Sequence, residues 1–130
     1  MQDLITLLRY MQFYTHMAHN VLGGETFFQD HAFLGDLYPV YESDYDSLVE
    51  RAIGSDIKIN IILSNQKSAS ILEEPSKYKE AFENILECEN DLCHACKIVS
   101  EKASIGLQNL LADISDRSEQ RQYKIKQRIL

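Results

Sequence analysis

Four side chains that can bind a metal ion are spread over the first 50 residues. They are His19, His31, Asp46 and Glu50. Asp46 and Glu50 are four residues apart, so on a helix they project from one face about a turn apart and can share a cation. Histidine and carboxylate ligands leave positions on ferrous iron open for an oxidant. The residue types therefore indicate a redox-active metal site rather than a structural one.

The distance along the chain restricts how such a site can be built. His31 and Asp46 are 15 residues apart, which is roughly 22 Å at about 1.5 Å per helical residue. Ligands of one metal must converge within a few ångströms. If both residues serve one site, the carboxylates must come from a second copy of the chain, related by a two-fold axis. The pattern therefore links metal binding to dimerisation.

Hydrophobic periodicity places these four residues on two helices. The first apolar pattern runs from Asp3 to about Leu22 and stops at the paired glycines 23–24, which favour a turn. The second starts near Phe27 and continues to Gly54. Pro39 lies inside the second helix, where we expect a kink rather than an end, because the apolar spacing continues in phase.

The second half of the chain predicts two more long helices. Residues 55–69 alternate like a strand around Ile57–Ile61, but a lone strand has no partner here, so we interpret this segment as a long connection with a short helix. The third long helix is expected to have Pro75 in its first turn and to reach Val99. The fourth follows a break at 104–106, and its polar middle, 116–122, is expected to be exposed or used in subunit contacts.

Four helices with one long crossover between the second and third have the connectivity of ferritin-like bundles. The sequence therefore predicts an all-α fold, a single ferritin-like four-helix-bundle domain over residues 1–130. The crossover would carry the short helix. A chain of 130 residues that is 45% hydrophobic is large enough to bury one core.

Residues 4–54 resemble the Dps family of mini-ferritins. The resemblance rests on the stretch HNVLGG beginning at His19, then Phe27, His31 and Leu34, and finally Asp46 followed by Glu50-Arg51-Ala52. The family motif has a histidine closing the first helix, a glycine turn, a phenylalanine, a second histidine twelve residues on, and Asp-x-x-x-Glu-Arg. Outside residues 4–54 the resemblance extends only to helix order and length.

This resemblance implies a twelve-subunit hollow shell with ferroxidase sites at its two-fold interfaces. Ferrous iron would be oxidised there, with hydrogen peroxide as the preferred oxidant, and the ferric product stored inside. His19 and His31 of one subunit, with Asp46 and Glu50 of the other, would be the iron ligands. The implied function is that of an iron-sequestering ferroxidase that protects against oxidative stress. The alternative is a non-catalytic scaffold or nucleoid-associated protein that keeps the fold.

The sequence departs from the family pattern at the metal site. Where the family has a carboxylate four residues after the second histidine, this chain has Gly35, and Asp36 lies next to it, about 100° round the helix. Asn20 stands where a tryptophan is common. We expect one tightly bound iron and a weaker second one, with Asp36 or water filling in. A carboxylate installed at position 35 is expected to tighten the second iron.

Other metal-capable residues have simpler interpretations. Cys88, Cys93 and Cys96 are expected to be core thiols, because His94 points about 100° away from the cysteine face. The pair Asp91 and His94 echoes the Glu-x-x-His motif of larger ferritins, but no second copy exists. His16 is expected to lie at the surface or behind the ligands.

Charged residues of the last helix form two groups. Asp113, Asp116 and Glu119 could line an acidic iron-entry pore, although a solvated acidic face is at least as good an interpretation. A basic group is interpreted as a surface or interface stripe; it comprises Arg117, Arg121, Lys124, Lys126 and Arg128.

The overall charge bears on partners and location. The net charge is −7, with 20 acidic and 13 basic residues, and the chain begins in the first helix without a Lys-rich arm, so we expect DNA binding to be weak or absent. Charged residues interrupt every apolar stretch before it could span a membrane. Three cysteines without a leader segment predict a reducing, cytoplasmic environment.

Overall fold

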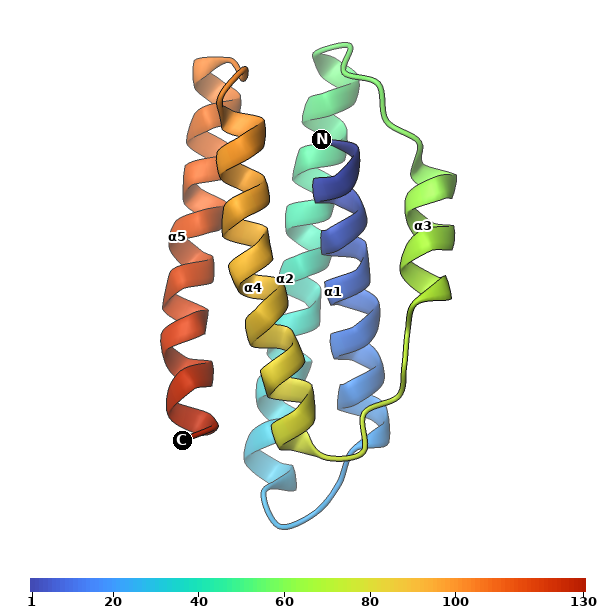
Figure 1. Cartoon of the computed structure of the whole chain (residues 1–130), viewed down its shortest axis with the longest axis vertical. Helices are drawn as coiled ribbons and strands as arrows, with labels where there is room; N and C mark the ends of the chain where they lie inside the picture. The colour runs from blue at the N-terminus through green and yellow to red at the C-terminus, as the bar shows by residue number, and fades with distance from the viewer.

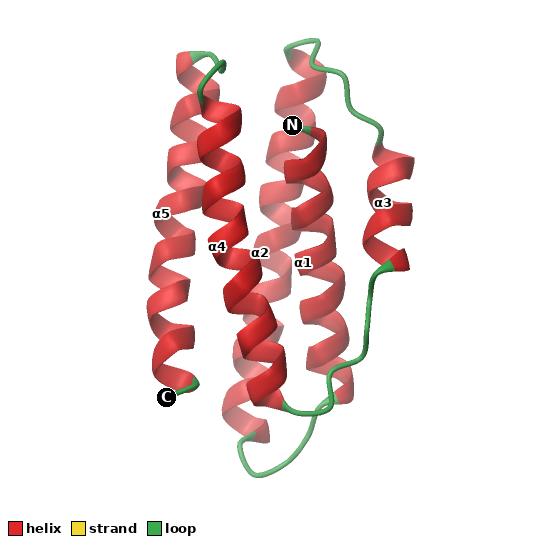
Figure 2. Ribbon diagram, viewed as in Figure 1, coloured by secondary structure: helices red, strands yellow, loops and turns green.

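The structure, a computed structural model, describes residues 1–130 and consists of five helices without a strand (Figures 1 and 2). The all-α prediction is confirmed. Four long helices lie side by side, and a short one lies outside them (Figure 1). The helices are α1 (Gln2–Val21), α2 (Phe27–Gly54), α3 (Ile61–Ser70), α4 (Tyr78–Ser100) and α5 (Ile105–Arg128).

The first two helices end and begin within a residue of the predicted positions. The buried positions of α1 recur every three or four residues, so that a single face meets the core. Gly24 has a φ of +122°, a left-handed conformation that other residues rarely adopt, and it lets the chain reverse direction before α2. Pro39 lies inside α2, which continues past it to Gly54, so the predicted continuity is confirmed.

The connection between α2 and α4 carries the short helix α3, as predicted. Asn60 caps α3, because its side chain accepts a hydrogen bond from the Leu63 backbone N–H at 2.9 Å. Ser64 and Ser68 are fully buried against α1, where they bond to Gln2 and Thr6. Polar contacts therefore attach α3 to the bundle, while Ile61 and Ile62 in its first turn are exposed.

The start of α4 differs from the expectation. Pro75 was predicted to lie in its first turn, but α4 begins at Tyr78. The Glu80 side chain reaches back to Ser76 and accepts hydrogen bonds from its backbone N–H at 3.1 Å and its hydroxyl at 2.6 Å. This arrangement fixes residues 75–77 as the cap that precedes the helix.

The four long helices share one hydrophobic core. Its largest fully buried side chains come from all four helices, including Leu8 and Met11 of α1, Leu34 and Tyr41 of α2, Phe82 and Leu92 of α4, and Leu111 and Ile114 of α5. None of the helices combines the length and the apolar character needed to cross a membrane.

The polar middle of α5 contradicts its prediction. Residues 116–122 were expected to be exposed or used in subunit contacts, but Ser118 is fully buried and Gln122 nearly so. Both side chains donate hydrogen bonds to the backbone oxygen of Glu89 in α4. Buried polar groups are stable when they are paired in this way. Ser118 and Gln122 therefore face the bundle, while Asp116, Glu119 and Gln120 of the same stretch are exposed.

Three arginines of the expected basic stripe also belong to the bundle rather than to its surface. Each forms an ion pair with a buried carboxylate of another helix. The pairs are Arg117 with Asp44 at 2.8 Å, Arg121 with Glu89 at 3.0 Å, and Arg128 with Asp30 at 2.6 Å. Lys124 and Lys126 are exposed, as expected. Charge pairing therefore fixes α5 against α2 and α4.

Replacing Arg121 by methionine should destabilise the protein strongly. Glu89 is fully buried, and a buried charge that loses its partner costs about 3–5 kcal/mol. We expect urea unfolding at fixed protein concentration to report a loss of this size. Lys124→Met, at an exposed position of the same helix, is the control and should change stability by less than about 0.5 kcal/mol. Equal effects of the two substitutions would contradict the role given to the pair.

Replacing Asp30 by asparagine should remove a pH-dependent part of the stability. Burial alone would raise the pKa of Asp30, but hydrogen bonds from Arg128 and Thr26 lower it below its usual value. A lowered folded-state pKa gives stability that is complete above the unfolded pKa near 3.8 and is lost as the pH falls through the folded pKa. We expect the variant to be about 1–3 kcal/mol less stable at pH 7.

In urea unfolding, the difference between wild type and Asp30→Asn should be the same at pH 5 and pH 4 and should shrink at pH 3, below the unfolded pKa near 3.8. Asp36→Asn, an exposed aspartate of the same helix, is the matched control. A difference that stays constant down to pH 3 would show that the Asp30 carboxylate does not supply this stability.

Candidate metal centre

The turn between α1 and α2 brings His19 and His31 together. His19 lies in the last turn of α1 and His31 in the second turn of α2. Their rings stack with centroids 3.8 Å apart and an interplanar angle of 18°, and both residues are half-buried. Two of the predicted ligands therefore meet within one chain.

Reciprocal hydrogen bonds fix both histidine rings. Nδ1 of His19 donates to the His31 carbonyl oxygen, and Nδ1 of His31 donates to the His19 carbonyl oxygen, each at 2.9 Å. A carbonyl oxygen only accepts, so each Nδ1 carries a hydrogen and the lone pair of the neutral ring is on Nε2. Metal-binding histidines are commonly oriented in this way, with the other ring nitrogen bonded to a carbonyl oxygen.

The ring geometry restricts how the pair can bind metal. An imidazole binds a metal ion in its own plane, with the nitrogen about 2 Å away. Two stacked rings whose centroids are 3.8 Å apart and whose planes are only 18° from parallel do not both have one ion in their planes at that distance. In this arrangement each ring can therefore serve a separate ion.

Gly35 lies directly beneath the His19 ring. A Cβ atom added to Gly35 would be 2.9 Å from Cε1 and 3.2 Å from Nδ1 of His19. In the sequence, Gly35 marks only the position of a missing carboxylate ligand, and α2 continues through it. The space left by the missing side chain is occupied by the histidine ring.

Aromatic side chains extend the histidine pair on both sides. Phe27 stacks on His31 with centroids 4.5 Å apart. His16 is exposed, as expected, and stacks on Tyr38 at 4.0 Å, while its ring lies 6.4 Å from that of His19. These contacts restrict the rotation of the rings without supplying another ligand to the pair.

The predicted carboxylate ligands do not join the histidines within one chain. Asp36, Asp46 and Glu50 are exposed on α2. No group of three or more histidine, cysteine, aspartate or glutamate side chains in the chain is placed to hold a metal ion. The single chain thus supplies one pair of nitrogen ligands and, further along α2, a separate pair of exposed carboxylates.

The cysteines lie in or beside the core, as predicted. Cys88 and Cys96 are buried, and burial raises their pKa values to about 12 and about 11, so both thiols stay protonated at neutral pH. Cys93 is half-buried and donates to the Ser115 carbonyl oxygen. Asp91 and His94 are both exposed.

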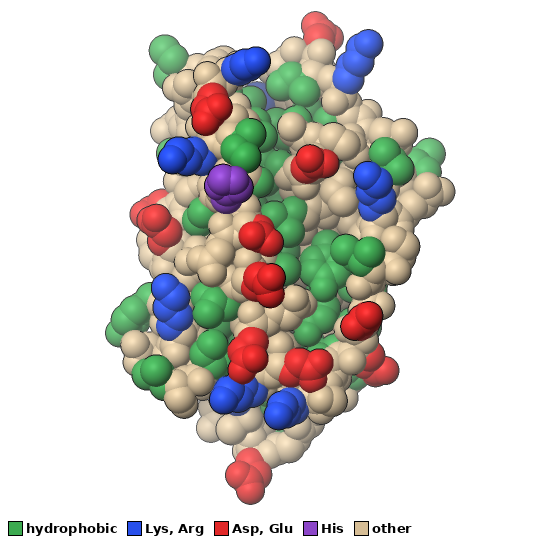
Figure 3. All heavy atoms as spheres, viewed as in Figure 1, with side chains coloured by type: hydrophobic (Ala, Val, Ile, Leu, Met, Phe, Trp, Pro, Cys, Tyr) green, Lys and Arg blue, Asp and Glu red, His purple; other side chains and the backbone are tan.

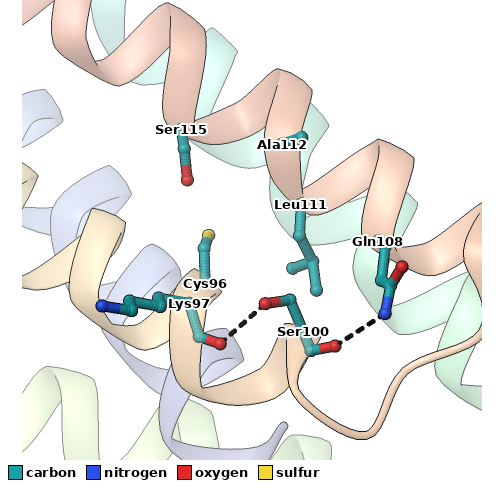
Figure 4. Close-up of a pocket in the computed structure, with 7 residues that line it drawn as sticks. All are labelled: Cys96, Lys97, Ser100, Gln108, Leu111, Ala112 and Ser115. Atoms are coloured by element: carbon teal, nitrogen blue, oxygen red, sulfur yellow. Dashed lines mark hydrogen bonds between the residues drawn. The ribbon is translucent and has the colours of Figure 1, made fainter.

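A cavity of about 360 Å³ lies between α4 and α5, beside Cys96 (Figure 4). Cys96 and Ser115 lie at one side of it, and Gln108 closes the other by donating to the Ser100 carbonyl oxygen at 3.1 Å. Because the thiol is protonated, this cavity offers neither a nucleophile nor a thiolate ligand.

The acidic group of α5 is exposed, and two of its members bond within the helix. Asp113 pairs with Arg117 at 3.2 Å, and Asp116 accepts a hydrogen bond from Gln120 at 3.1 Å. Further acidic side chains follow α4 on the face formed by α1, α3 and α4 (Figure 3). They belong to an exposed stripe of Glu80, Glu83, Glu87 and Asp91. The surface is therefore negative along this helix.

A buried polar cluster lies between α2, α4 and α5 and was not predicted from the sequence. Glu89 and Arg121 form its centre, and the nearby Tyr41 hydroxyl is buried without a hydrogen-bond partner. Burial and the charge of Glu89 raise the pKa of Tyr41 well above its usual value. A signal was present, because Glu89 follows Ile85 and precedes Leu92 in the apolar phase of α4.

Comparisons with protein-family models, with curated proteins and with solved structures find no match to this chain.

Proposed function

We propose that the chain is a subunit of a ferritin-like shell of the Dps type, which binds ferrous iron and oxidises it at sites shared between two-fold-related subunits. The observation that carries the proposal is the histidine pair, whose Nδ1 atoms are bonded to carbonyl oxygens so that both Nε2 atoms are free for metal. The path of the chain, with α3 in the connection between α2 and α4, is consistent with a ferritin-like bundle (Figure 1).

The remaining ligands would come from the partner subunit. Asp46 and Glu50 are exposed on α2 and form no ion pair within the chain. An antiparallel arrangement of two α2 helices would bring the carboxylates of one subunit to the histidines of the other, and would do so twice in each dimer. Asp36 is exposed on α2 next to Gly35, and its carboxylate could supply a further oxygen ligand.

Two ions per site suit the proposed chemistry. Reduction of hydrogen peroxide to two waters consumes two electrons and two protons, and each ferrous ion supplies one electron on becoming ferric. One imidazole per ion would leave positions on both ions open for the carboxylates and the oxidant.

The alternative is a non-catalytic ferritin-like scaffold or a nucleoid-associated protein. The exposed acidic stripe of α4 and the net charge of −7 disfavour direct contact with nucleic-acid phosphates. A well-folded oligomer that consumes no peroxide in the presence of ferrous iron would favour the scaffold.

Mixing two inactive variants should restore iron oxidation. A His31→Ala chain and an Asp46→Ala chain form a mixed dimer in which one site keeps both its histidines and its carboxylates. Random pairing makes about half of the dimers mixed, so about a quarter of the wild-type sites should return. The measurement is iron-dependent consumption of hydrogen peroxide after joint unfolding and refolding.

The control mixes His31→Ala with His19→Ala. Both residues belong to the same half of the site, so every mixed dimer lacks one histidine at each site and no activity should return. Equal activity in the two mixtures, or full activity in a wild-type monomer, would contradict the shared site.

The stacked rings predict separate ions for the two histidines. Anaerobic titration of the wild type should detect two ferrous ions per chain, the second one weaker because position 35 offers no carboxylate. His19→Ala and His31→Ala should each lose one ion and keep the other. If each substitution abolishes all binding, the two rings share one ion after rotating out of the stack.

A further inference from the structure

The His19 ring lies against α2 at the one glycine whose missing side chain makes room for another group. The three atoms nearest to a Cβ built on Gly35 all belong to the His19 ring, at 2.9, 3.2 and 3.8 Å. A Cβ on Gly23, Gly24 or Gly54 would meet nothing within 4 Å, and one on Gly106 would make an ordinary contact with Nη1 of Arg51 at 3.4 Å. A real Cβ is essentially never found as close as 2.9 Å to another heavy atom, so the ring must leave its present position if residue 35 has a side chain.

The His19 ring is not free to move away from position 35. Its Nδ1 is bonded to the His31 carbonyl oxygen, its face is stacked on the His31 ring, and Tyr38 lies 5.6 Å away on the following turn. The neighbouring residue Ala18 is fully buried, so the backbone of α1 is held by the core. Displacing the ring would therefore break the hydrogen bond that leaves Nε2 free.

The local sequence of α2 is unfavourable for a helix at this point. Glycine is a poor residue for a helix interior. Pro39, four residues later, has no N–H to donate to the Gly35 carbonyl oxygen. The helix nevertheless continues through both residues, and at Gly35 the His19 ring is the group that lies against it.

We propose that Gly35 is a positioning residue of the metal centre. Its missing side chain leaves the space that the His19 ring occupies, and any side chain at this position, a carboxylate included, displaces that ring. The importance of this role for iron oxidation rests on the proposed function. The consequence reverses the expectation from sequence, because Gly35→Asp should weaken metal binding instead of strengthening it.

A double-mutant cycle tests whether Gly35 positions the His19 ring. Zn²⁺ serves as a redox-inert probe that binds histidine nitrogen and carboxylate oxygen, and its affinity is measured by calorimetry for the wild type, Gly35→Ala, His19→Ala and the double variant. Gly35→Ala should lower the affinity about tenfold or more, as disturbing the support of a metal ligand commonly does. With His19 already replaced, the same substitution should leave the affinity unchanged, because no ring remains to be displaced.

Gly54→Ala is the matched control, because it adds the same methyl group to α2 where nothing lies within 4 Å. Its Zn²⁺ affinity should equal that of the wild type. Gly35→Asp should behave like Gly35→Ala or bind more weakly. Tighter binding by Gly35→Asp, or an unchanged affinity for Gly35→Ala, would overturn the proposal.

A crystal structure of Gly35→Ala separates this inference from the proposed function. The His19 ring should have moved, with its bond to the His31 carbonyl oxygen broken. A ring that keeps both its position and this bond would show that Gly35 does not position His19, whatever the protein binds. If the ring moves as expected but the wild type binds no metal at the histidines, the positioning role of Gly35 is supported and the ferroxidase proposal fails.

Discussion

Two hydrogen bonds across the turn between α1 and α2 determine the geometry of the candidate metal centre. Each histidine donates from Nδ1 to the carbonyl oxygen of the other. The His19 carbonyl oxygen lies in the last turn of α1, where helix carbonyl oxygens lack an intrahelical donor. The His31 ring therefore donates a hydrogen bond to a carbonyl oxygen that the end of α1 would otherwise leave without a donor. The same bond fixes the orientation of the His31 ring. The same contact serves the fold and the site, so the free Nε2 atoms follow from the closure of the helix pair.

Ion pairs hold α5 against α2 and α4. This helix has few apolar residues in its middle, and its attachment depends on arginines that reach buried carboxylates of α2 and α4. A buried carboxylate without a partner would be costly, so each arginine is needed once its carboxylate is inside. The protein thus combines an apolar core with a polar cluster, and the middle and the C-terminal end of α5 are fixed to α2, which carries part of the candidate site, and to α4.

Most of the fold could be predicted from the sequence, because helix boundaries and periodicity are local. The apolar spacing and the glycine turn located α1 and α2, and the lack of a pairing partner ruled out a strand before Ile61. The start of α4 was missed because the back-bonding of Glu80 to Ser76 competes with proline as a helix start. The burial of Ser118 and Gln122 was missed because polar residues are usual at a surface, and the sequence does not show that their partner Glu89 lies inside the bundle.

For the candidate site, the sequence by itself determined which residues can bind metal and that a rigid helix keeps His31 far from Asp46, since residue type and helical rise are properties of the local chain. Only the tertiary structure decided that His19 and His31 stack, that their planes are too nearly parallel for one ion, and that Gly35 is the space the His19 ring occupies. Ring orientation depends on contacts between two helices, and those contacts form only when α1 and α2 pack against each other across the turn.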